Sequence, residues 1–298
     1  MCQEMIHCTL CPRSCGVDRT VTVGRCGVGA QVRLARAALH FWEEPCISGE
    51  KGSGTVFFSG CSLRCVFCQN YSISAGGYGK DVSIERLAQI FLELQEQGAN
   101  NINLVTGEHY IPQIIRALDL VKDSLHLPVV YNSSGYETVE AVRMLKGYVD
   151  VYLPDLKYCS PERSARYSHA PDYFAVATKA IQEMAKQVGP VQFDENGILK
   201  KGLIVRHMVM PGGVEDSMDI LTWIAENLPL DDILVSVMSQ YTPFYKSGEY
   251  PEINRRLNQA EYDRVLDWMD CMGIENGFVQ ELSSAKEEYT PDFSLQGV

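Results

Sequence analysis

The sequence predicts an α/β fold in which β-strands alternate with α-helices over most of the chain. Between residues 51 and 282, short apolar runs rich in β-branched side chains are separated by segments with helical periodicity. Strands and helices that alternate in this way form a parallel sheet whose crossover helices cover its faces. Six strand–helix units therefore predict a partial (β/α)6 barrel of the TIM type rather than a closed barrel of eight units.

Seven runs are predicted as strands because they are apolar and rich in residues that favour extended structure. They are Thr55–Ser59, Asn101–Thr106, Pro128–Tyr131, Val149–Leu153, Leu203–Met210, Ile233–Met238 and a weaker Gly277–Gln280. Helices are predicted between them at Ser83–Gln97, Ile111–Leu125, Glu137–Leu145, Tyr173–Val188, Ser217–Asn227 and Gln259–Met272. An added hairpin is predicted at 191–200, where Asn196-Gly197 is a typical hairpin turn.

The first predicted helix shows how these boundaries are assigned. Apolar residues recur at positions 84, 87, 88 and 91, which is the spacing of an amphipathic helix. Ser83 precedes them as a candidate N-cap, and Gly98 follows the last apolar position as a typical stop. The pattern therefore predicts a helix that lays one apolar face on the sheet.

Three regions follow from the composition along the chain. Residues 1–50 form a Cys-rich and Gly-rich N-terminal segment, 51–285 form the predicted barrel, and 286–298 form a polar tail. A short polar terminus without a periodic pattern is predicted to be loosely held.

Charge and composition exclude several classes of function. The chain has 298 residues and a formal net charge of -12, and it contains no Lys/Arg-rich run of the kind that nucleic-acid binding requires. It has no apolar stretch long enough to span a membrane and no signal-peptide pattern, so a cytoplasmic location is expected. Eleven cysteines in a reducing compartment indicate metal binding or catalysis rather than disulfides.

Three cysteines form an incomplete ligand set directly after the first predicted strand. Cys61, Cys65 and Cys68 occur as Cys-x3-Cys-x2-Cys within a single loop. Structural zinc and Fe–S sites usually have four protein ligands, so three thiols leave one coordination position open. The spacing therefore predicts a metal centre with a place for an exogenous ligand.

Four further cysteines near the N-terminus form a complete ligand set. Cys8, Cys11, Cys15 and Cys26 give the pattern Cys-x2-Cys-x3-Cys-x10-Cys, with several glycines around them. A structural Zn²⁺ and a second [4Fe–4S] cluster both suit this pattern, and the spacing does not choose between them. Such a site would supply folding energy to a segment that has little apolar core of its own.

Polar groups also follow the later strands, where a barrel of this type places its active site. Glycine permits close approach of the backbone to a ligand, a carboxylate accepts hydrogen bonds from an ammonium group, and an Asp–Lys pair can bind both charges of a zwitterion. The candidates at these strand ends are Gly107, Glu108, Asn132, Ser133, Asp155, Lys157 and Arg206.

The Cys-x3-Cys-x2-Cys loop after the first strand of an α/β chain resembles the radical S-adenosylmethionine (SAM) superfamily. In that family the three thiolates hold a [4Fe–4S] cluster, and SAM chelates the open iron through its amino and carboxylate groups. The resemblance implies these two cofactors and an external one-electron reductant of the flavodoxin or ferredoxin type. It also implies that the strand-end residues bind SAM, and Thr106-Gly107-Glu108 resembles the Gly-Gly-Glu motif with Thr106 in place of the first Gly.

Shorter motifs are similar to the activating enzymes of glycyl radical enzymes. Asp155-Leu156-Lys157 and Arg206 with Pro211-Gly212 match motifs of that group. The N-terminal cysteine motif looks like a branch often named as pyruvate formate-lyase activating enzyme-like. Two segments depart from the group, since Asn132-Ser133 replaces an Asp-Thr pair and Gln240-Tyr241 begins a segment that replaces Pro-Tyr-His.

The resemblance implies an oxidoreductase that cleaves SAM reductively and abstracts a hydrogen atom from its substrate. The branch implies a glycyl radical enzyme as the protein partner. The alternatives are a reaction on a small molecule or a peptide, or, in a different class, a non-catalytic Fe–S electron-transfer protein. Neither a nucleic acid nor a membrane is expected as a partner.

Overall fold

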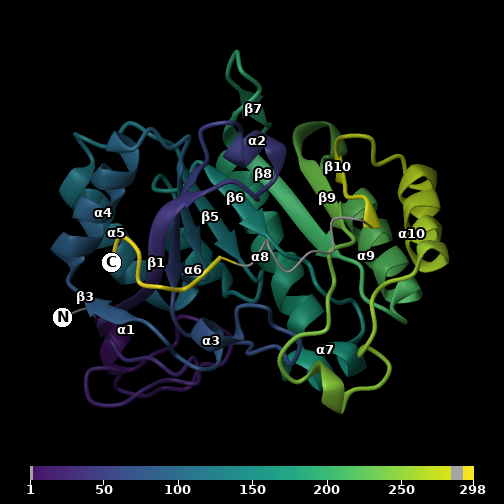
Figure 1. Cartoon of the computed structure of the whole chain (residues 1–298), viewed down its shortest axis with the longest axis horizontal. Coiled ribbons are helices and arrows are strands. Elements are labelled where there is room, and N and C mark those ends of the chain that lie inside the picture. Colours follow the sequence, from purple (N-terminus) through teal and green to yellow (C-terminus); the bar gives the residue numbers. More distant parts are fainter. Residues whose placement is uncertain (1–2, 283–290) are drawn as a thin grey trace.

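The computed structural model of the protein describes residues 3–282 and 291–298, and within this part ten strands form one sheet. The strand order is β10-β9-β8-β6-β5-β4-β2-β1-β3, with β7 paired to β8 (Figure 1). The edge strands β10 and β3 are not neighbours in this order, so the sheet stays open. The α/β class and the partial barrel predicted from the sequence are confirmed.

Seven strands run parallel and form the body of the sheet. They are β2 (Ser53–Phe58), β4 (Ile102–Val105), β5 (Val129–Ser133), β6 (Val151–Pro154), β8 (Leu199–Met208), β9 (Leu234–Met238) and β10 (Gly277–Val279). Each coincides with a strand predicted from its apolar composition. The hairpin also forms, because β7 (Gln192–Phe193) pairs antiparallel with β8.

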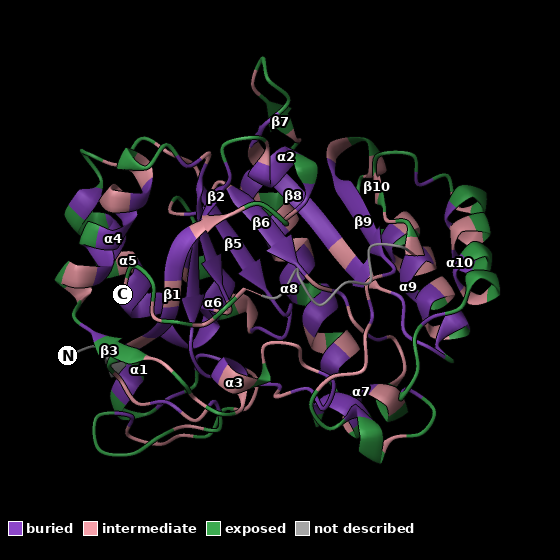
Figure 2. Ribbon diagram, viewed as in Figure 1, coloured by how far each residue is buried: buried purple, intermediate pink, exposed green. Residues whose placement is uncertain are grey.

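The predicted helices connect these strands and cover one face of the sheet (Figure 1). They are α4 (Ile84–Glu96), α5 (Ile111–Val121), α6 (Val139–Met144), α8 (Tyr173–Val188), α9 (Val214–Asn227) and α10 (Gln259–Cys271). Figure 2 shows the strands buried at the centre, while α4 and α10 present exposed outer faces. None of the helices in the described part of the chain is long and apolar enough to cross a membrane.

Helix α4 forms for the reasons that its sequence suggests. The Ser83 hydroxyl accepts a hydrogen bond from the Arg86 N–H and so caps the first turn. The buried side chains include Leu87, Ala88 and Phe91, which lie on one face of the helix. They belong to the main hydrophobic cluster between helices and sheet.

The opposite face of the sheet has a smaller core of its own. The four-residue helix α2 (Pro45–Ser48) contributes Cys46 and Ile47 to it. Their partners are inward-facing strand residues, namely Val130, Val151, Leu153, Leu199, Ile204 and Leu234. Helix α2 therefore packs against the inner face of the sheet.

The sequence did not predict the antiparallel edge of the sheet. Strand β1 (Val32–His40) pairs antiparallel with β2 and with β3 (Lys80–Val82). Two arginines interrupt its apolar pattern, and it lies within the segment that the cysteines dominate. Residues 32–40 thus extend the sheet, and the Cys-rich segment is not separate from it.

Several short elements also escaped prediction. Helix α7 (Pro161–Ser168) begins after the N-cap Ser160, whose hydroxyl accepts from the Arg163 N–H. The remaining turns of helix are α1 (Gln3–Ile6), α3 (Tyr71–Ser74), η1 (Glu108–Tyr110), η2 (Leu230–Asp232) and η3 (Ser247–Glu249).

The described part of the C-terminal tail is held against β1 rather than loosely attached. Backbone hydrogen bonds run from the Leu295 N–H to the Ala35 carbonyl and from the Ala37 N–H to the Gln296 carbonyl. The Phe293 ring packs edge-on against Phe57 at 5.4 Å. Backbone pairing with an edge strand leaves little signal in side-chain composition, which explains the wrong expectation. Residues 286–290 of the predicted tail lie outside the described part.

Gly135 fixes the spacing between the loop after β5 and the end of β6. Its φ of 73° is in the left-handed region, and a Cβ atom there would lie 2.4 Å from the Asp155 carbonyl oxygen. Gly147 has a similar φ of 85°, yet a Cβ atom there would meet nothing within 4 Å. Both glycines therefore adopt a backbone conformation that a side chain disfavours. Only at Gly135 would an added side chain also clash with a neighbouring atom.

We predict that Gly147→Ala lowers the free energy of unfolding by about 1–2 kcal/mol, the usual cost of a side chain in this conformation. Gly135→Ala should cost at least about 1 kcal/mol more, because the methyl group also displaces the Asp155 backbone. Urea titrations of both variants measure the difference. Equal losses in the two variants would show that the strand end adapts to the methyl group without cost.

Candidate active site

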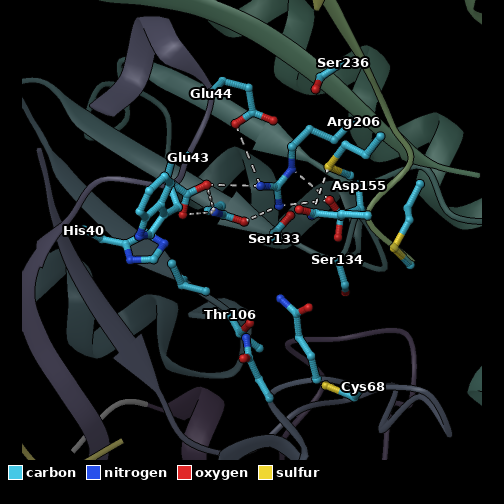
Figure 3. A pocket seen from close by; sticks show the side chains of 18 of the residues that line it. His40, Glu43, Glu44, Cys68, Thr106, Ser133, Ser134, Asp155, Arg206 and Ser236 are labelled. Atoms are coloured by element: carbon cyan, nitrogen blue, oxygen red, sulfur yellow. Dashed lines mark hydrogen bonds and ion pairs between the residues drawn. The ribbon is translucent and has the colours of Figure 1, made fainter. Parts of the chain in front are cut away.

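A cavity of about 740 Å³ lies on the inner face of the sheet, opposite the helices. The cysteine loop that follows β2 forms one end, and the connection between β1 and α2 forms the floor. Strand residues from β5, β8 and β9 form the wall between them (Figure 3). Such a volume lies in the range of sites that bind small molecules and cofactors.

The three loop cysteines all line this cavity, as the sequence predicted. Cys61 and Cys65 are buried and Cys68 is partly buried, and all three are free thiols. The Ser168 hydroxyl donates to Cys65 Sγ at 2.9 Å, and the Ser74 hydroxyl donates to Cys68 Sγ at 3.3 Å. Three free sulfurs that converge on one cavity are a donor set that fits an Fe–S cluster.

Burial governs the ionisation of these thiols in the protein alone. It raises the pKa of Cys61 well above its ordinary value, and the pKa of Cys68 to about 11. Burial also raises the pKa of Cys65, although the Lys157 ammonium opposes the shift. Metal ligation requires thiolates, so binding of a cluster would release the protons of these groups.

A ladder of alternating charges leads from the cysteine loop to the floor. The Lys157 ammonium donates to Asp155, and Arg206 Nε donates to Asp155 Oδ1 at 2.9 Å. Arg206 Nη1 then donates to Glu43 Oε2 at 3.2 Å and lies 4.0 Å from Glu44 Oε2. Burial alone would raise the pKa of Asp155, but the two cations hold it below its ordinary value. The ladder therefore keeps buried charges paired.

Asn132 and Ser133 at the end of β5 complete the wall, as predicted. Asn132 Oδ1 accepts from Arg206 Nη2 at 2.7 Å, and its Nδ2 donates to Glu43 Oε1 at 3.3 Å. Five of the seven predicted SAM-binding residues thus line the cavity, namely Asn132, Ser133, Asp155, Lys157 and Arg206.

Gly107 and Glu108 do not line the cavity in this structure. The Glu108 side chain is fully buried in η1, where Oε1 accepts from the Ser62 hydroxyl at 3.3 Å. Burial alone would raise its pKa, but His109 and other donors hold the pKa below its ordinary value. Thr106 lines the cavity instead, with a φ of 60° that glycine adopts more easily. A role of Gly107 and Glu108 in SAM binding stays a prediction.

Glu43 and Glu44 are the site residues that sequence reasoning missed. They follow β1. Because this strand was not predicted, there was no basis for predicting that the two glutamates lie near the strand ends. Glu44 is buried and Glu43 is partly buried, and burial raises the pKa of each against the opposing effect of the Arg206 guanidinium. The signal available was two adjacent carboxylates within the apolar stretch Phe41-Trp42-Glu43-Glu44-Pro45.

The four N-terminal cysteines lie next to the cysteine loop. Cys8, Cys11 and Cys26 are buried and Cys15 is exposed. A Cβ atom on Gly24 would lie 3.3 Å from Cys26 Sγ and 3.5 Å from Cys15 Sγ, so these two thiols flank one glycine. The Cys61 N–H donates to the Cys26 carbonyl at 3.2 Å, which joins the two thiol-bearing segments directly.

In the described residues, no three His, Cys, Asp or Glu side chains stand ready to share a single metal ion. Four thiols around one Zn²⁺ would lie roughly 3.8 Å apart, given a Zn–S bond of about 2.3 Å in a tetrahedron. A larger cluster separates its ligands more widely, so this finding bears on a single ion rather than on a cluster.

Comparisons with known proteins agree with this geometry. Residues 55–224 match the model of the radical SAM superfamily. An uncharacterized protein of Methanocaldococcus jannaschii is 33% identical over 281 residues, which cover 90% of this chain and 76% of that protein.

Two solved structures share the fold. Methylornithine synthase is 14% identical with a TM-score of 0.51, over 79% of this chain and 74% of that one. Streptococcus suis SuiB, solved with its precursor peptide SuiA, is 14% identical with a TM-score of 0.51, over 76% of this chain and 48% of that one. The chain therefore belongs to the radical SAM superfamily, whose members use a [4Fe–4S] cluster and SAM.

Proposed function

We propose that Cys61, Cys65 and Cys68 hold the catalytic [4Fe–4S] cluster of this radical SAM enzyme. The observation that carries the proposal is the convergence of three free thiols, two of them buried and one partly buried, on one end of a cavity large enough for a cofactor. When bound, the cluster and SAM supply one-electron cleavage of SAM to methionine and a 5′-deoxyadenosyl radical, which takes a hydrogen atom from the substrate. The electron comes from an external reductant, and a flavodoxin or a ferredoxin-like protein suits this role.

Hydrogen bonds and a nearby positive charge from the protein would adjust the properties of the sulfur ligands. The hydroxyls of Ser168 and Ser74 donate to Cys65 and Cys68, and hydrogen bonds to sulfur tune the potential of such clusters. The Lys157 ammonium favours the Cys65 thiolate. Burial of the loop excludes water from the site.

We further propose that the strand-end residues bind SAM from the wall of the cavity. The Lys157–Asp155 pair offers both signs of charge to the zwitterionic end of SAM, and lies on the side of the cavity that faces Cys65. Asn132 and Ser133 offer amide and hydroxyl groups to the rest of the cofactor.

The substrate is either a glycyl radical enzyme or a small molecule or peptide. The short motifs shared with activating enzymes support the first, and the cavity volume of about 740 Å³ supports a small substrate or a single inserted side chain. A glycyl radical signal by electron paramagnetic resonance, formed on a co-purified partner with SAM and reductant, would select the first. Turnover of a free substrate without such a signal would select the second.

We propose a second metal site at Cys8, Cys11, Cys15 and Cys26, occupied by a [4Fe–4S] cluster or Zn²⁺. The separation of the thiols in the described residues favours the cluster. Three of the four thiols are buried, and their segment adjoins the cysteine loop through the hydrogen bond between Cys61 and Cys26. A cluster here would stand beside the catalytic one and could pass it the electron. A reducing compartment, the cytoplasm, suits all ten described cysteines, since none forms a disulfide.

Cys65→Ser is expected to abolish the formation of 5′-deoxyadenosine from SAM and dithionite, because a serine hydroxyl does not ionise near neutral pH to replace the thiolate. The assay uses anaerobically reconstituted protein, with iron and sulfide analysis. Cys271→Ser, at an exposed position in α10, is the matched control and should keep wild-type cleavage. A Cys65→Ser protein that cleaves SAM at the wild-type rate would contradict the assignment.

Cys11→Ser is expected to lower the bound metal by the content of one site and to lower the thermal midpoint, because the metal contributes folding energy to the N-terminal segment. Zinc, iron and sulfide analysis of wild type and variant identifies the metal that is lost. The Cys271→Ser protein again serves as the control. Unchanged metal content in the Cys11→Ser protein would rule out the second site.

A further inference from the structure

Positively charged side chains gather around the two thiol-bearing segments, although the chain as a whole has a formal net charge of -12. Arg13, Arg25 and Arg64 each lie within two residues of a cysteine of one of the two sets. Lys246, directly before η3, joins them because its N–H donates to the Val66 carbonyl inside the cysteine loop at 2.8 Å. These four side chains are called the basic patch below.

Contacts between the segments bring the basic patch together. Arg13 Nε donates to the Ser62 carbonyl of the cysteine loop at 3.0 Å, and its Nη2 donates to the Ser168 carbonyl at the end of α7 at 3.0 Å. Carbonyl partners leave the positive charge of the guanidinium uncompensated. The Arg64 guanidinium packs against Gly27 of the N-terminal segment. Helices α1, α3 and α7 lie along this edge of the molecule (Figure 1).

The exposed His169, which follows α7, registers the field of the patch. Partial burial lowers its pKa, and so do the positive charges of Arg25, Arg13 and Lys246, which all lie near its imidazole. Arg25 and Lys246 are themselves exposed. Of the ion pairs in the described part of the chain, none includes a side chain of the basic patch.

Neighbouring carboxylates offset the patch only in part. Asp172 accepts from the Tyr136 hydroxyl at 2.7 Å, and the Arg13 guanidinium lies 5.1 Å from the centre of the same ring. Glu249 donates its N–H to the Lys246 carbonyl at 2.9 Å, so its carboxylate is also local. These two negative charges stand against four positive ones. The surface therefore keeps a positive charge on an otherwise acidic protein.

A stacked pair of tyrosines adjoins the patch. The rings of Tyr71 and Tyr245 lie 5.0 Å apart and nearly parallel, and they are 43% and 42% exposed. The Lys246 ammonium lies 5.5 Å from the Tyr245 ring centre. Exposed tyrosines beside cationic groups are typical of surfaces that bind another protein, because such rings add contact area at little entropic cost.

The place of the patch selects the kind of partner. Cys15 is the exposed member of the N-terminal thiol set, so a metal centre held by that set reaches the surface beside Arg13 and Arg25. An electron that enters the protein has its shortest path where a metal ligand meets the surface. Duplex DNA or an anionic membrane would have no reason to bind at this point, whereas an electron donor with an acidic surface would.

We propose that the basic patch is the docking surface for an acidic one-electron donor of the flavodoxin or ferredoxin type. The reduced flavin or iron–sulfur group of the donor is oxidised by one electron, and that electron reduces the iron–sulfur centre held by the thiols; no covalent bond forms or breaks. This inference rests on the proposed function, because it assigns the contact surface of the reductant that the function requires.

The test measures association of the reconstituted protein with an immobilised flavodoxin and, in a second arm, with an immobilised ferredoxin, by anaerobic surface plasmon resonance. We expect Arg25→Glu and Lys246→Glu each to lower the association rate constant about 10-fold at low salt, because opposite charges steer the encounter. The difference should vanish at about 1 M salt, where the Debye length is about 3 Å. The arm that responds identifies the class of donor.

Lys179→Glu makes the same change of charge at an exposed position of α8 and is the matched control, which should associate as wild type does. Cleavage of SAM with dithionite needs no docking, so all three variants should keep it. Arg25 adjoins a thiol of the second set, and Lys246→Glu keeps the test valid if Arg25→Glu loses iron.

Absence of binding to either donor would overturn the proposal, as would patch variants that associate like wild type. Binding of duplex DNA or of phosphatidylglycerol vesicles, but of neither donor, would also overturn it and would assign the patch to that ligand. Formation of 5′-deoxyadenosine with dithionite tests the proposed function separately. Wild type that cleaves SAM with dithionite yet binds neither donor contradicts this inference alone.

Discussion

The buried guanidinium of Arg206 is the group around which the inner face of this protein is organised. A charge removed from water must be paired and hydrogen-bonded, since an uncompensated ion inside a protein costs several kcal/mol. Arg206 meets that demand with Asp155 of the β6 end, Asn132 of β5 and Glu43 from the connection after β1. Four separate segments of the chain must therefore take up their positions together, and the cavity forms between them.

Much of the fold could be predicted because its main signal is local. Runs such as Val151–Pro154 are buried on both faces of a parallel sheet, so they are apolar throughout and stand out in the sequence. Strand β1 carries Arg33 and Arg36, and its neighbours were cysteines and glycines, so its pairing with β2 left no such trace. The backbone pairing of residues 291–298 with β1 also leaves no pattern in the sequence, because main-chain hydrogen bonds do not depend on side-chain type.

The residues of the candidate site likewise include some that could be predicted from the sequence and some that could not. The cysteine loop and the Asp155–Lys157 pair follow predicted strands, and the geometry of a parallel sheet brings such positions to one edge. Glu43 and Glu44 reach the cavity from an antiparallel strand, so no rule of parallel topology could place them. Glu108 is the opposite case. It follows a predicted strand, as a site residue should, but it lies buried in a 3-10 helix.

The hydrogen bond between the Cys61 N–H and the Cys26 carbonyl ties the N-terminal region to the cysteine loop. One continuous segment bears the second thiol set, touches the catalytic loop, continues as β1 and ends in the acidic floor of the cavity. The residues before β2 thus contribute to the surroundings of the cysteine loop, to the sheet and to the floor of the cavity. A substitution that displaces this stretch would therefore disturb the cysteine loop and the floor of the cavity together.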